Sequence, residues 1–337
     1  MSRQLRVLVT GASGYLGARL VARARASGFQ VVCVDQIARE SCGQHLRADI
    51  SKAGPWQNAF CGVHTVFHLA GKAHAVSEFR QDEAEYFRVN TDGTRFTLEA
   101  ARRAGAQRFV LFSSVKAMSR SHAASQLGVT PDRPLDESDA VEPDTPYGRS
   151  KLAAEALVLA GGYVPEPVVL RLCDVYGPAS KGNLQQMLAA VARRRFPPLP
   201  RVPNRRSMVH VDDVLAAATL AASHQAAVHN VFIVSDGRAY STEEILAQMR
   251  RAIGHPPISR AAPLAIYRAL GVVGDHLGRI RGRRFVFDTN TLTSLLDSSW
   301  FSSAKIERLL GFRPEWNLEQ ALRSMIAALP IRSAETE

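Results

Sequence analysis

The sequence has few cysteines, no long apolar run and no visible secretory signal. Its 337 residues include four cysteines and no C-x-x-C pair: Cys33, Cys42, Cys61 and Cys173. This scarcity excludes a disulfide framework and a zinc-ribbon pattern, and indicates reduced thiols in a cytoplasmic compartment. The longest apolar candidate, Pro263–Gly274, contains Arg268 and is shorter than the roughly 18 residues that a membrane-spanning helix needs. We therefore expect a cytoplasmic protein with no stable membrane insertion.

Acidic side chains are also fewer than basic ones. The chain has 31 Asp and Glu against 42 Lys and Arg, a net charge of +11 with histidine neutral. Such a balance favours polyanionic partners: nucleic acid, an anionic membrane surface or phosphorylated small molecules. Arginines gather at 193–206 and 279–284. Because only Phe196 lies within the first group and no nucleic-acid-binding signature is present, we expect no nucleic-acid partner. The stretch 264–284 fits either peripheral attachment to an anionic membrane or a packed helix with an exposed basic end.

Strand-like and helix-like segments alternate through the first half of the chain. Short β-branched runs stand at 5–9, 30–35, 63–70, 108–112 and 167–172, with helix-like runs at 18–27, 86–104 and 147–159. A content of 46% hydrophobic and 22% charged residues is that of an ordinary globular chain. The alternation predicts βαβ units, hence an α/β fold with a doubly wound parallel sheet of the Rossmann type.

A glycine-rich loop joins the first predicted strand to the first helix. Its pattern is G-x-x-G-x-x-G, at Gly11, Gly14 and Gly17. The glycines permit a tight turn, close approach of backbone to a pyrophosphate, and close packing of helix on strand, while the helix N-terminus faces the phosphates. Asp35 ends the next strand, where a carboxylate accepts hydrogen bonds from an adenosine ribose. Its charge repels a 2′-phosphate and so favours NAD, although Arg39, four residues on, leaves NADP as an alternative.

Tyr147 and Lys151 form a candidate acid/base pair. They stand four residues apart, and such residues share one helix face. A free phenol has a pKa of about 10, and a nearby ammonium together with an oxidised nicotinamide lowers it. Such a tyrosine can exchange a proton with a sugar hydroxyl or ketone while a hydride moves. The pair follows a strand that ends in Ser113-Ser114.

Taken together, these segments resemble the extended short-chain dehydrogenase/reductase family of NAD-dependent epimerases and dehydratases. The matching pieces are the loop 11–17, Asp35, 48–50, 68–71, Asn90, Ser113-Ser114 and the Tyr147/Lys151 pair. The resemblance implies catalysis by Ser114, Tyr147 and Lys151, with Ser113 as the alternative contact to the substrate oxygen. It implies a cofactor site made of the following residues: Gly11, Ser13, Gly14, Tyr15, Leu16, Gly17, Asp35, Asp49, Ile50, Leu69, Ala70, Gly71, Lys72, Asn90, Tyr147 and Lys151.

The resemblance also implies a layout and an assembly. A Rossmann domain would comprise 1–172 and about 207–235, and a smaller, discontinuous C-terminal domain that binds the UDP-sugar would comprise about 173–206 and 236–332. Family members are often dimers, so we expect a homodimer.

Local residues favour one branch of this family. The 4,6-dehydratases have an Asp-Glu pair after the catalytic hydroxyl, where this chain has Val115-Lys116, so dehydration is disfavoured. The retained Tyr147/Lys151 pair argues against a non-catalytic, cofactor-sensing branch. The segments 181–183, 204–207 and 234–237 look most like bacterial O-antigen enzymes. These act at C4 of UDP-N-acetylhexosamines, as 4-epimerases or as 4-ketoreductases of the UDP-N-acetylquinovosamine type; UDP-glucose 4-epimerase is the alternative.

The same resemblance implies three substrate contacts. Asn183 would hydrogen-bond the diphosphate, and Arg206 would clamp it with paired, charge-assisted bonds. Ser299, which precedes Trp300, would leave room for an N-acetyl group. Leu292 stands near the place of a second diphosphate arginine, for which Arg281, Arg283 or Arg284 could substitute.

Three histidines are weighed as possible metal ligands or catalysts. His64 and His68 lie four apart in a strand pattern, which separates their side chains, and no third ligand is evident. We therefore expect no metal site, and we expect His210 to be packed.

Overall fold

The computed structural model describes residues 5–37, 44–72, 82–118, 132–180, 182–196, 200, 202–257, 263–281 and 289–329. Arg39, Lys181, Arg201, Arg283 and Arg284 lie outside these ranges, as does the side chain of Arg281.

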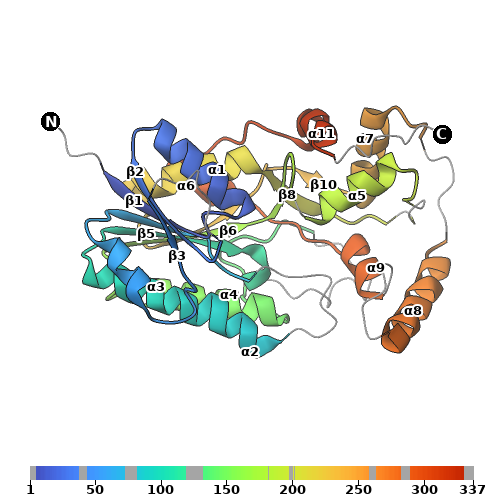
Figure 1. Cartoon of the computed structure of the whole chain (residues 1–337). Coiled ribbons are helices and arrows are strands. Elements are labelled where there is room, and N and C mark those ends of the chain that lie inside the picture. The colour runs from blue at the N-terminus through green and yellow to red at the C-terminus, as the bar shows by residue number, and fades with distance from the viewer. Residues whose placement is uncertain are drawn as a thin grey trace, which may run out of the picture.

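A seven-stranded sheet organises the first two thirds of the chain (Figure 1). Its strands are β1 (Arg6–Thr10), β2 (Gln30–Asp35), β3 (Gln44–Arg47), β4 (Thr65–His68), β5 (Arg108–Ser114), β6 (Glu166–Leu172) and β9 (Asn230–Val234). Their order is β3-β2-β1-β4-β5-β6-β9, and every neighbouring pair is parallel. The predicted doubly wound parallel sheet is therefore confirmed, with β3 as an edge strand that the sequence did not predict. The chain runs outward from β1 in both directions, so the switch point lies between β1 and β4.

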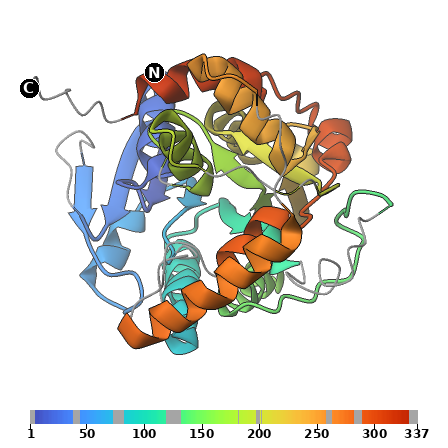
Figure 2. The ribbon, with the colours of Figure 1, turned by 90° about the vertical axis from the view of Figure 1, so that its right-hand side faces the viewer.

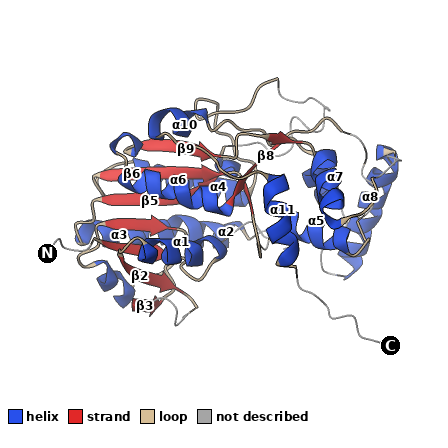
Figure 3. Ribbon diagram, turned by 90° about the horizontal axis from the view of Figure 1, so that it is seen from above, coloured by secondary structure: helices blue, strands red, loops and turns tan. Residues whose placement is uncertain are grey.

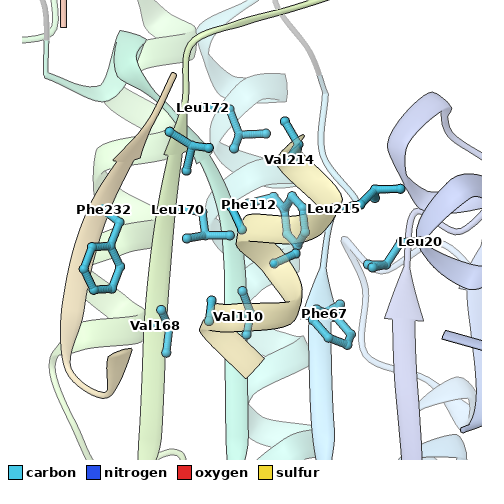
Figure 4. Close-up of a cluster of buried hydrophobic side chains, with 14 of the residues drawn as sticks. Leu20, Phe67, Val110, Phe112, Val168, Leu170, Leu172, Val214, Leu215 and Phe232 are labelled. Atoms are coloured by element: carbon cyan, nitrogen blue, oxygen red, sulfur yellow. The ribbon is translucent and has the colours of Figure 1, made fainter. Parts of the chain in front are cut away.

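Helices cover both faces of this sheet, as its apolar strands require (Figure 3). One face packs against α1 (Tyr15–Ala26), α6 (Val211–Ser223) and α10 (Ala304–Leu310), and the other against η2 (Pro55–Phe60), α3 (Gly93–Arg103) and α4 (Pro146–Leu159). Figure 4 shows α6 lying over the central strands, with Val214 and Leu215 directed at side chains of β5 and β6 such as Phe112 and Leu170. The two buried clusters hold the sheet rigid beneath the loops at its carboxyl edge.

Several short helical segments connect these elements: α2 (Glu83–Tyr86), the π-helix η3 (Phe87–Asp92), η4 (Val115–Ala117) and η6 (Gln225–Ala227). The helix expected over 86–104 is thus divided: a π-turn precedes α3. A π-turn inside a helix commonly marks a functional site, and this one contains Asn90.

A smaller unit follows β6. Its three-stranded sheet has the order β10-β8-β7, from β7 (Asp174–Tyr176), β8 (Arg206–His210) and β10 (Ala239–Tyr240). Three helices share one apolar cluster beside it: α5 (Asn183–Ala192), α7 (Thr242–Ile253) and α11 (Leu318–Ala327). Local signals fix their ends. The Ser241 side chain caps α7, Gly254 ends it in the left-handed conformation, and a capping box starts α11. The domain boundaries themselves stay a prediction.

Two further helices lie at the outer end of this smaller unit (Figure 2). They are α8 (Leu264–Arg281) and α9 (Thr289–Leu296), which pack against each other. After α9 the chain returns to pair with β8 at Ser299. Within the ranges given above, no helix is both long and apolar enough to cross a membrane.

Candidate active site

The glycine loop forms a tight cradle at the carboxyl end of β1. Gly11 has a φ of +68°, and a Cβ there would lie 2.7 Å from the backbone nitrogen of Ala70. A Cβ on Gly17 would lie 2.1 Å from the Gly11 carbonyl oxygen, so a side chain at either position would collide with backbone. No side chain caps the N-terminus of α1 at Gly14. The backbone N–H groups in the first turn of α1 and the positive end of its dipole are therefore suited to bind a pyrophosphate.

The Asp35 carboxylate faces this loop from the end of β2. Its Oδ2 accepts a hydrogen bond from the backbone N–H of Ser13 at 2.8 Å, and Oδ1 accepts one from the N–H of Ile37 at 3.3 Å. The Ala48 N–H donates to the Asp35 carbonyl at 2.7 Å. A carboxylate held beside the phosphate cradle is placed to accept hydrogen bonds from a ribose, and its charge disfavours a 2′-phosphate.

Asp49 and Ile50 lie beside Asp35, after β3. The Asp49 Oδ1 accepts hydrogen bonds from the Ser51 hydroxyl at 2.7 Å and the Ser51 N–H at 3.0 Å. Partial burial opposes ionisation of Asp49, but these bonds and the charge of Arg88 outweigh it and hold the pKa of the carboxyl below its usual range. Ile50 is buried. This combination of an ionised carboxylate and an apolar wall suits one edge and one face of an adenine.

The remaining cofactor predictions fall on the first turn of α1 and on the segment after β4. Tyr15 and Leu16 begin α1, and the Tyr15 hydroxyl is buried without a hydrogen-bond partner among the described residues. Leu69 and Ala70 are tied to Thr10: the Leu69 N–H donates to its carbonyl at 3.3 Å and the Ala70 N–H to its hydroxyl at 3.2 Å. Both segments therefore border the switch point between β1 and β4.

A buried polar chain runs under this region through His68. Its Nδ1 bonds the Thr10 hydroxyl at 2.8 Å and its Nε2 bonds the Thr94 hydroxyl at 3.0 Å. The Thr94 hydroxyl donates to the Asn90 carbonyl at 2.6 Å, so the network fits a neutral imidazole that donates from Nε2. Burial, helped by the charge of Lys151, lowers the pKa of His68 to about 3. His68 is thus a structural residue.

Asn90 connects the cofactor segment to α4. Its side-chain oxygen accepts from the Lys72 N–H at 2.8 Å, and its nitrogen donates to the Lys72 carbonyl at 3.1 Å and to the Ser150 hydroxyl at 2.9 Å. A Cβ on Gly71 would lie 2.8 Å from the Asn90 oxygen. Lys72 also pairs with Glu85. In this geometry Asn90 positions the segment 70–72, because both ends of its amide are already bonded.

Tyr147 and Ser114 meet at the carboxyl end of β5. Thr145 caps α4 and Pro146 begins it, which places Tyr147 in the first turn. The two hydroxyls are hydrogen-bonded, and the Tyr86 ring packs edge-on against that of Tyr147 with 6.0 Å between centroids. The pKa of Tyr147 is raised to about 12, chiefly by burial. The bond to Ser114 opposes this rise, and Tyr86 and Asp174 add to it.

The protein groups alone therefore raise the pKa of Tyr147, whereas the lowering expected from the sequence requires an oxidised nicotinamide as well as the ammonium. Lys151 is buried one turn further on α4, and its ammonium donates to the Phe112 carbonyl at 2.7 Å. Burial lowers the pKa of Lys151 to about 8, against an opposing contribution from Glu155. Loss of solvation therefore dominates at the phenol, because the ammonium is directed at a backbone oxygen.

Ser113 is turned away from this pair. Its hydroxyl donates to the buried carboxylate of Glu155, which also accepts three hydrogen bonds from Arg171. Successive strand residues point to opposite faces, so Ser113 is not placed to contact a substrate at Tyr147, and Ser114 is. Glu155 was not predicted from the sequence, although it stands four residues after Lys151 on the same helix.

The predicted substrate residues Arg206 and Ser299 lie side by side. They pair in an isolated bridge, where the Ser207 N–H donates to the Ser299 carbonyl at 2.8 Å. The Arg206 guanidinium donates to Asp174 at 2.9 Å. Asn183 is exposed at the start of α5, on a separate element. Asp174 was not predicted from the sequence either, because it follows directly after Cys173 with no motif to mark it.

Other expectations concern packing and metals. Leu292 is buried. His210 is buried and stacks on Trp316, with ring centroids 4.5 Å apart, so it is packed as expected. Across the described ranges, no cluster of His, Cys, Asp or Glu could hold a metal ion.

Comparison with known proteins identifies the family. The model of the NAD dependent epimerase/dehydratase family matches residues 7–235. The chain is 26% identical over 329 residues to a UDP-glucose 4-epimerase of Vibrio cholerae, covering 96% of this chain and 94% of the relative. It is 25% identical over 330 residues to an N-acetyl-α-D-glucosaminyl-diphospho-ditrans,octacis-undecaprenol 4-epimerase of Escherichia coli O157:H7, covering 94% and 92%.

A solved structure shares the whole architecture. MoeE5, in complex with UDP-glucose and NAD, is 26% identical and superposes with a TM-score of 0.74 over 96% of this chain and 98% of its own. The cradle at Gly11–Gly17 and the carboxylate of Asp35 fit the same cofactor. The chain is an enzyme that belongs to the NAD-dependent epimerase/dehydratase family, and its cofactor is NAD.

Proposed function

We propose that this enzyme oxidises and reduces C4 of a UDP-sugar, acting as a 4-epimerase on UDP-N-acetylhexosamines. The observation that supports this best is the hydrogen-bonded pair of Ser114 and Tyr147, with Lys151 one turn further on α4. The pair stands at the edge of the sheet that also holds the glycine cradle. A proton-transfer group beside a nicotinamide site is what alcohol–ketone interconversion requires.

Each residue has a defined task in this chemistry. Bound NAD supplies the hydride acceptor and, once reduced, the hydride donor. Ser114 donates a hydrogen bond to the substrate oxygen at C4, and Tyr147 takes the proton of the 4-hydroxyl as the C4 hydride leaves. The resulting 4-ketose turns over in the site, and Tyr147 returns the proton when hydride adds to the opposite face. Lys151 anchors the end of β5 through the Phe112 carbonyl and provides positive charge.

The resting protonation state of Tyr147 favours one half of this cycle. With a pKa of about 12, the phenol is protonated at neutral pH and ready to donate to a 4-keto oxygen. The oxidation half needs the phenolate, which the positive charge of an oxidised nicotinamide bound at this site would favour. A 4-ketoreductase of UDP-4-keto-6-deoxy-N-acetylhexosamines, giving UDP-N-acetylquinovosamine-type sugars, uses only the donating half and is the second candidate.

The second half of the chain supports a UDP-sugar as substrate. Arg206 provides a planar cation for the diphosphate, and its neighbour Ser299 is small, which leaves space for an N-acetyl group. MoeE5 binds UDP-glucose, and the relatives named above act on UDP-glucose and on a lipid-linked N-acetylglucosaminyl diphosphate. A sugar diphosphate is common to all three. A UDP-glucose 4-epimerase is the alternative within this class. Four further points stay predictions: the contact of Asn183 with the diphosphate, the homodimer, the cytoplasmic location and a role in surface-polysaccharide synthesis.

The test compares wild type, Tyr147→Phe and the control Tyr163→Phe. Each is incubated with UDP-N-acetylglucosamine, UDP-glucose and a UDP-4-keto-6-deoxy-N-acetylhexosamine, and the products are identified by NMR. We expect wild type and the control to form the C4 epimer without added cofactor, and Tyr147→Phe to lose roughly a hundredfold or more in kcat. Stoichiometric consumption of added NADH with the keto sugar alone would identify the reductase. Equal activity of all three proteins would refute the role of Tyr147.

A further inference from the structure

The side chains of α8 are distributed in the reverse of the usual way for a helix at the edge of a domain. Its buried positions include three glycines, Gly271, Gly274 and Gly278, together with Tyr267. A Cβ on Gly271 would lie 3.3 Å from the Cα of Thr289, so the absence of a side chain at Gly271 allows α9 to approach closely. The inner face of α8 thus buries little side-chain surface apart from Tyr267.

The large apolar side chains of α8 point outward instead. Among the described residues, seven large hydrophobic side chains are exposed, and four belong to this helix: Ile266 at 51%, Leu270 at 50%, Val272 at 50% and Val273 at 54%. Ile266, Leu270 and Val273 have the spacing that aligns side chains along one helix face. Contiguous exposed apolar surface on a soluble domain marks an interaction site.

The exposed charges described on this helix are of one sign. Arg268 and Arg279 are exposed, whereas the only acidic residue from Leu264 to Arg281 is Asp275. Asp275 is engaged on the inner side, where it accepts hydrogen bonds from the Thr289 N–H at 3.2 Å and its hydroxyl at 2.8 Å. The outward surface therefore combines apolar side chains with arginines and has no carboxylate. A second copy on this face would add two more arginines and nothing to neutralise them.

We propose that α8 is a docking helix that lies flat on an anionic lipid bilayer. Its 18 residues extend over about 27 Å, enough for an interfacial helix. Its exposed surface is apolar along Ile266, Leu270 and Val273 and basic at the Val272 edge, and a helix that combines apolar and basic side chains binds such surfaces. Figures 1 and 3 show α8 at the outer end of the molecule, clear of the large sheet. A bilayer can therefore reach it without contacting the Rossmann fold. The inference concerns this surface alone and does not rest on the proposed function.

Vesicle co-sedimentation tests the proposal on the full-length protein. One set of vesicles is phosphatidylcholine alone, and the other contains phosphatidylglycerol as well, at physiological ionic strength. We expect wild type to bind the anionic vesicles and to lose binding as salt is raised. Arg268→Gln with Arg279→Gln is expected to weaken binding by roughly tenfold or more, since each arginine near an anionic surface contributes about fivefold. Leu270→Asn with Val273→Asn is expected to weaken it by a similar factor.

Matched controls separate this surface from general effects. Arg23→Gln with Arg103→Gln removes the same charge from exposed positions on α1 and α3. Leu5→Asn replaces a leucine with the same 50% exposure as Leu270. Both controls are expected to bind like wild type.

Three outcomes would overturn the proposal: no binding by wild type to anionic vesicles, equal binding by wild type and both α8 double variants, or equal loss in the controls.

Light scattering supplies a further readout. A wild-type dimer that the Leu270/Val273 variant converts to a monomer, without any vesicle binding, would assign α8 to a second copy instead. Activity on soluble UDP-sugars should be unchanged in all variants, so its absence in wild type would count against the proposed function and leave the docking result to be judged separately.

Discussion

The guanidinium of Arg206 donates a hydrogen bond to the carboxylate of Asp174, with 2.9 Å between Nη2 and Oδ2. The two residues lie on the neighbouring parallel strands β8 and β7. Asp174 also raises the pKa of Tyr147 through its charge. One carboxylate therefore connects the predicted diphosphate clamp to the predicted acid/base residue.

Replacing Arg206 should affect substrate binding more than chemistry. We expect Arg206→Ala to raise KM for the UDP-sugar by roughly tenfold to a hundredfold, the range for losing a charge-assisted hydrogen bond, with a smaller fall in kcat. Arg206→Lys keeps the charge but not the planar fork and should recover only part of the loss. Arg205→Ala is the control, because the neighbouring Arg205 stacks on Trp300 instead. Steady-state kinetics that gave both alanine variants the same KM would contradict the assignment.

Replacing Asp174 should shift the pH dependence of the oxidation half-reaction. Because the negative charge of Asp174 raises the pKa of Tyr147, Asp174→Asn is expected to lower that pKa, and the alkaline rise of kcat should begin at lower pH. Asp139→Asn is the control, since Asp139 is also paired with an arginine, Arg133, but on a surface loop. Superimposable pH profiles for wild type and Asp174→Asn would show that the carboxylate does not influence the phenol.

The sequence predicts elements better than it predicts contacts. The parallel sheet, the glycine cradle and the Tyr147/Lys151 helix all follow from local patterns, because periodicity and turn chemistry act over a few residues. Asp174 and Glu155 could not be found in that way. Their roles arise from β7 lying against β8 and from α4 packing on β5 and β6, which are long-range arrangements. The contribution of burial to the pKa of Tyr147 could not be found in that way either, since burial depends on everything packed around the ring.

Cofactor preference should respond to the charge of Asp35. Asp35→Asn keeps an oxygen that can accept the Ser13 N–H but removes the charge that repels a 2′-phosphate. We expect the preference for NADH over NADPH to fall by roughly tenfold, measured as the ratio of Kd values by fluorescence titration. Asp92→Asn, at a partly exposed residue paired with Arg95, should leave the ratio unchanged. A ratio that stayed at the wild-type value in Asp35→Asn would place the ribose elsewhere.

The buried pair of Glu155 and Arg171 should matter for stability. Glu155→Gln leaves Arg171 buried without its counter-charge, and such a change costs about 3–5 kcal/mol of unfolding free energy. Glu99→Gln, at a partly exposed ion pair with Arg95, should cost less than about 1 kcal/mol. The double variant Glu155→Leu/Arg171→Met should recover much of the loss, because it removes both charges. Urea unfolding measures all three, and a Glu155→Gln loss no larger than that of Glu99→Gln would contradict the argument.

Asp236 should make the protein less stable as the pH rises from about 4 to 7. Its Oδ2 accepts hydrogen bonds from the hydroxyls of Tyr176 at 3.0 Å and Tyr240 at 2.8 Å, and burial raises its pKa from 3.8 to about 6. A raised pKa means that the folded state favours the protonated form. The stabilisation is therefore full below about pH 4 and is lost as the pH passes through about 6, by up to about 3 kcal/mol at 1.4 kcal/mol per unit.

Asp236→Asn isolates this effect, because its amide accepts the same two hydrogen bonds and does not titrate in this range. The unfolding free energy of wild type minus that of Asp236→Asn, from urea unfolding at several pH values, should fall between about pH 4 and 7. Asp139→Asn provides a contrast of opposite sign. Hydrogen bonding to Arg133 holds the pKa of Asp139 below its usual range, so the corresponding difference should rise with pH through about 4. If the wild-type and Asp236→Asn curves ran parallel across this range, the Asp236 carboxyl would have to titrate at an ordinary pKa in the folded protein.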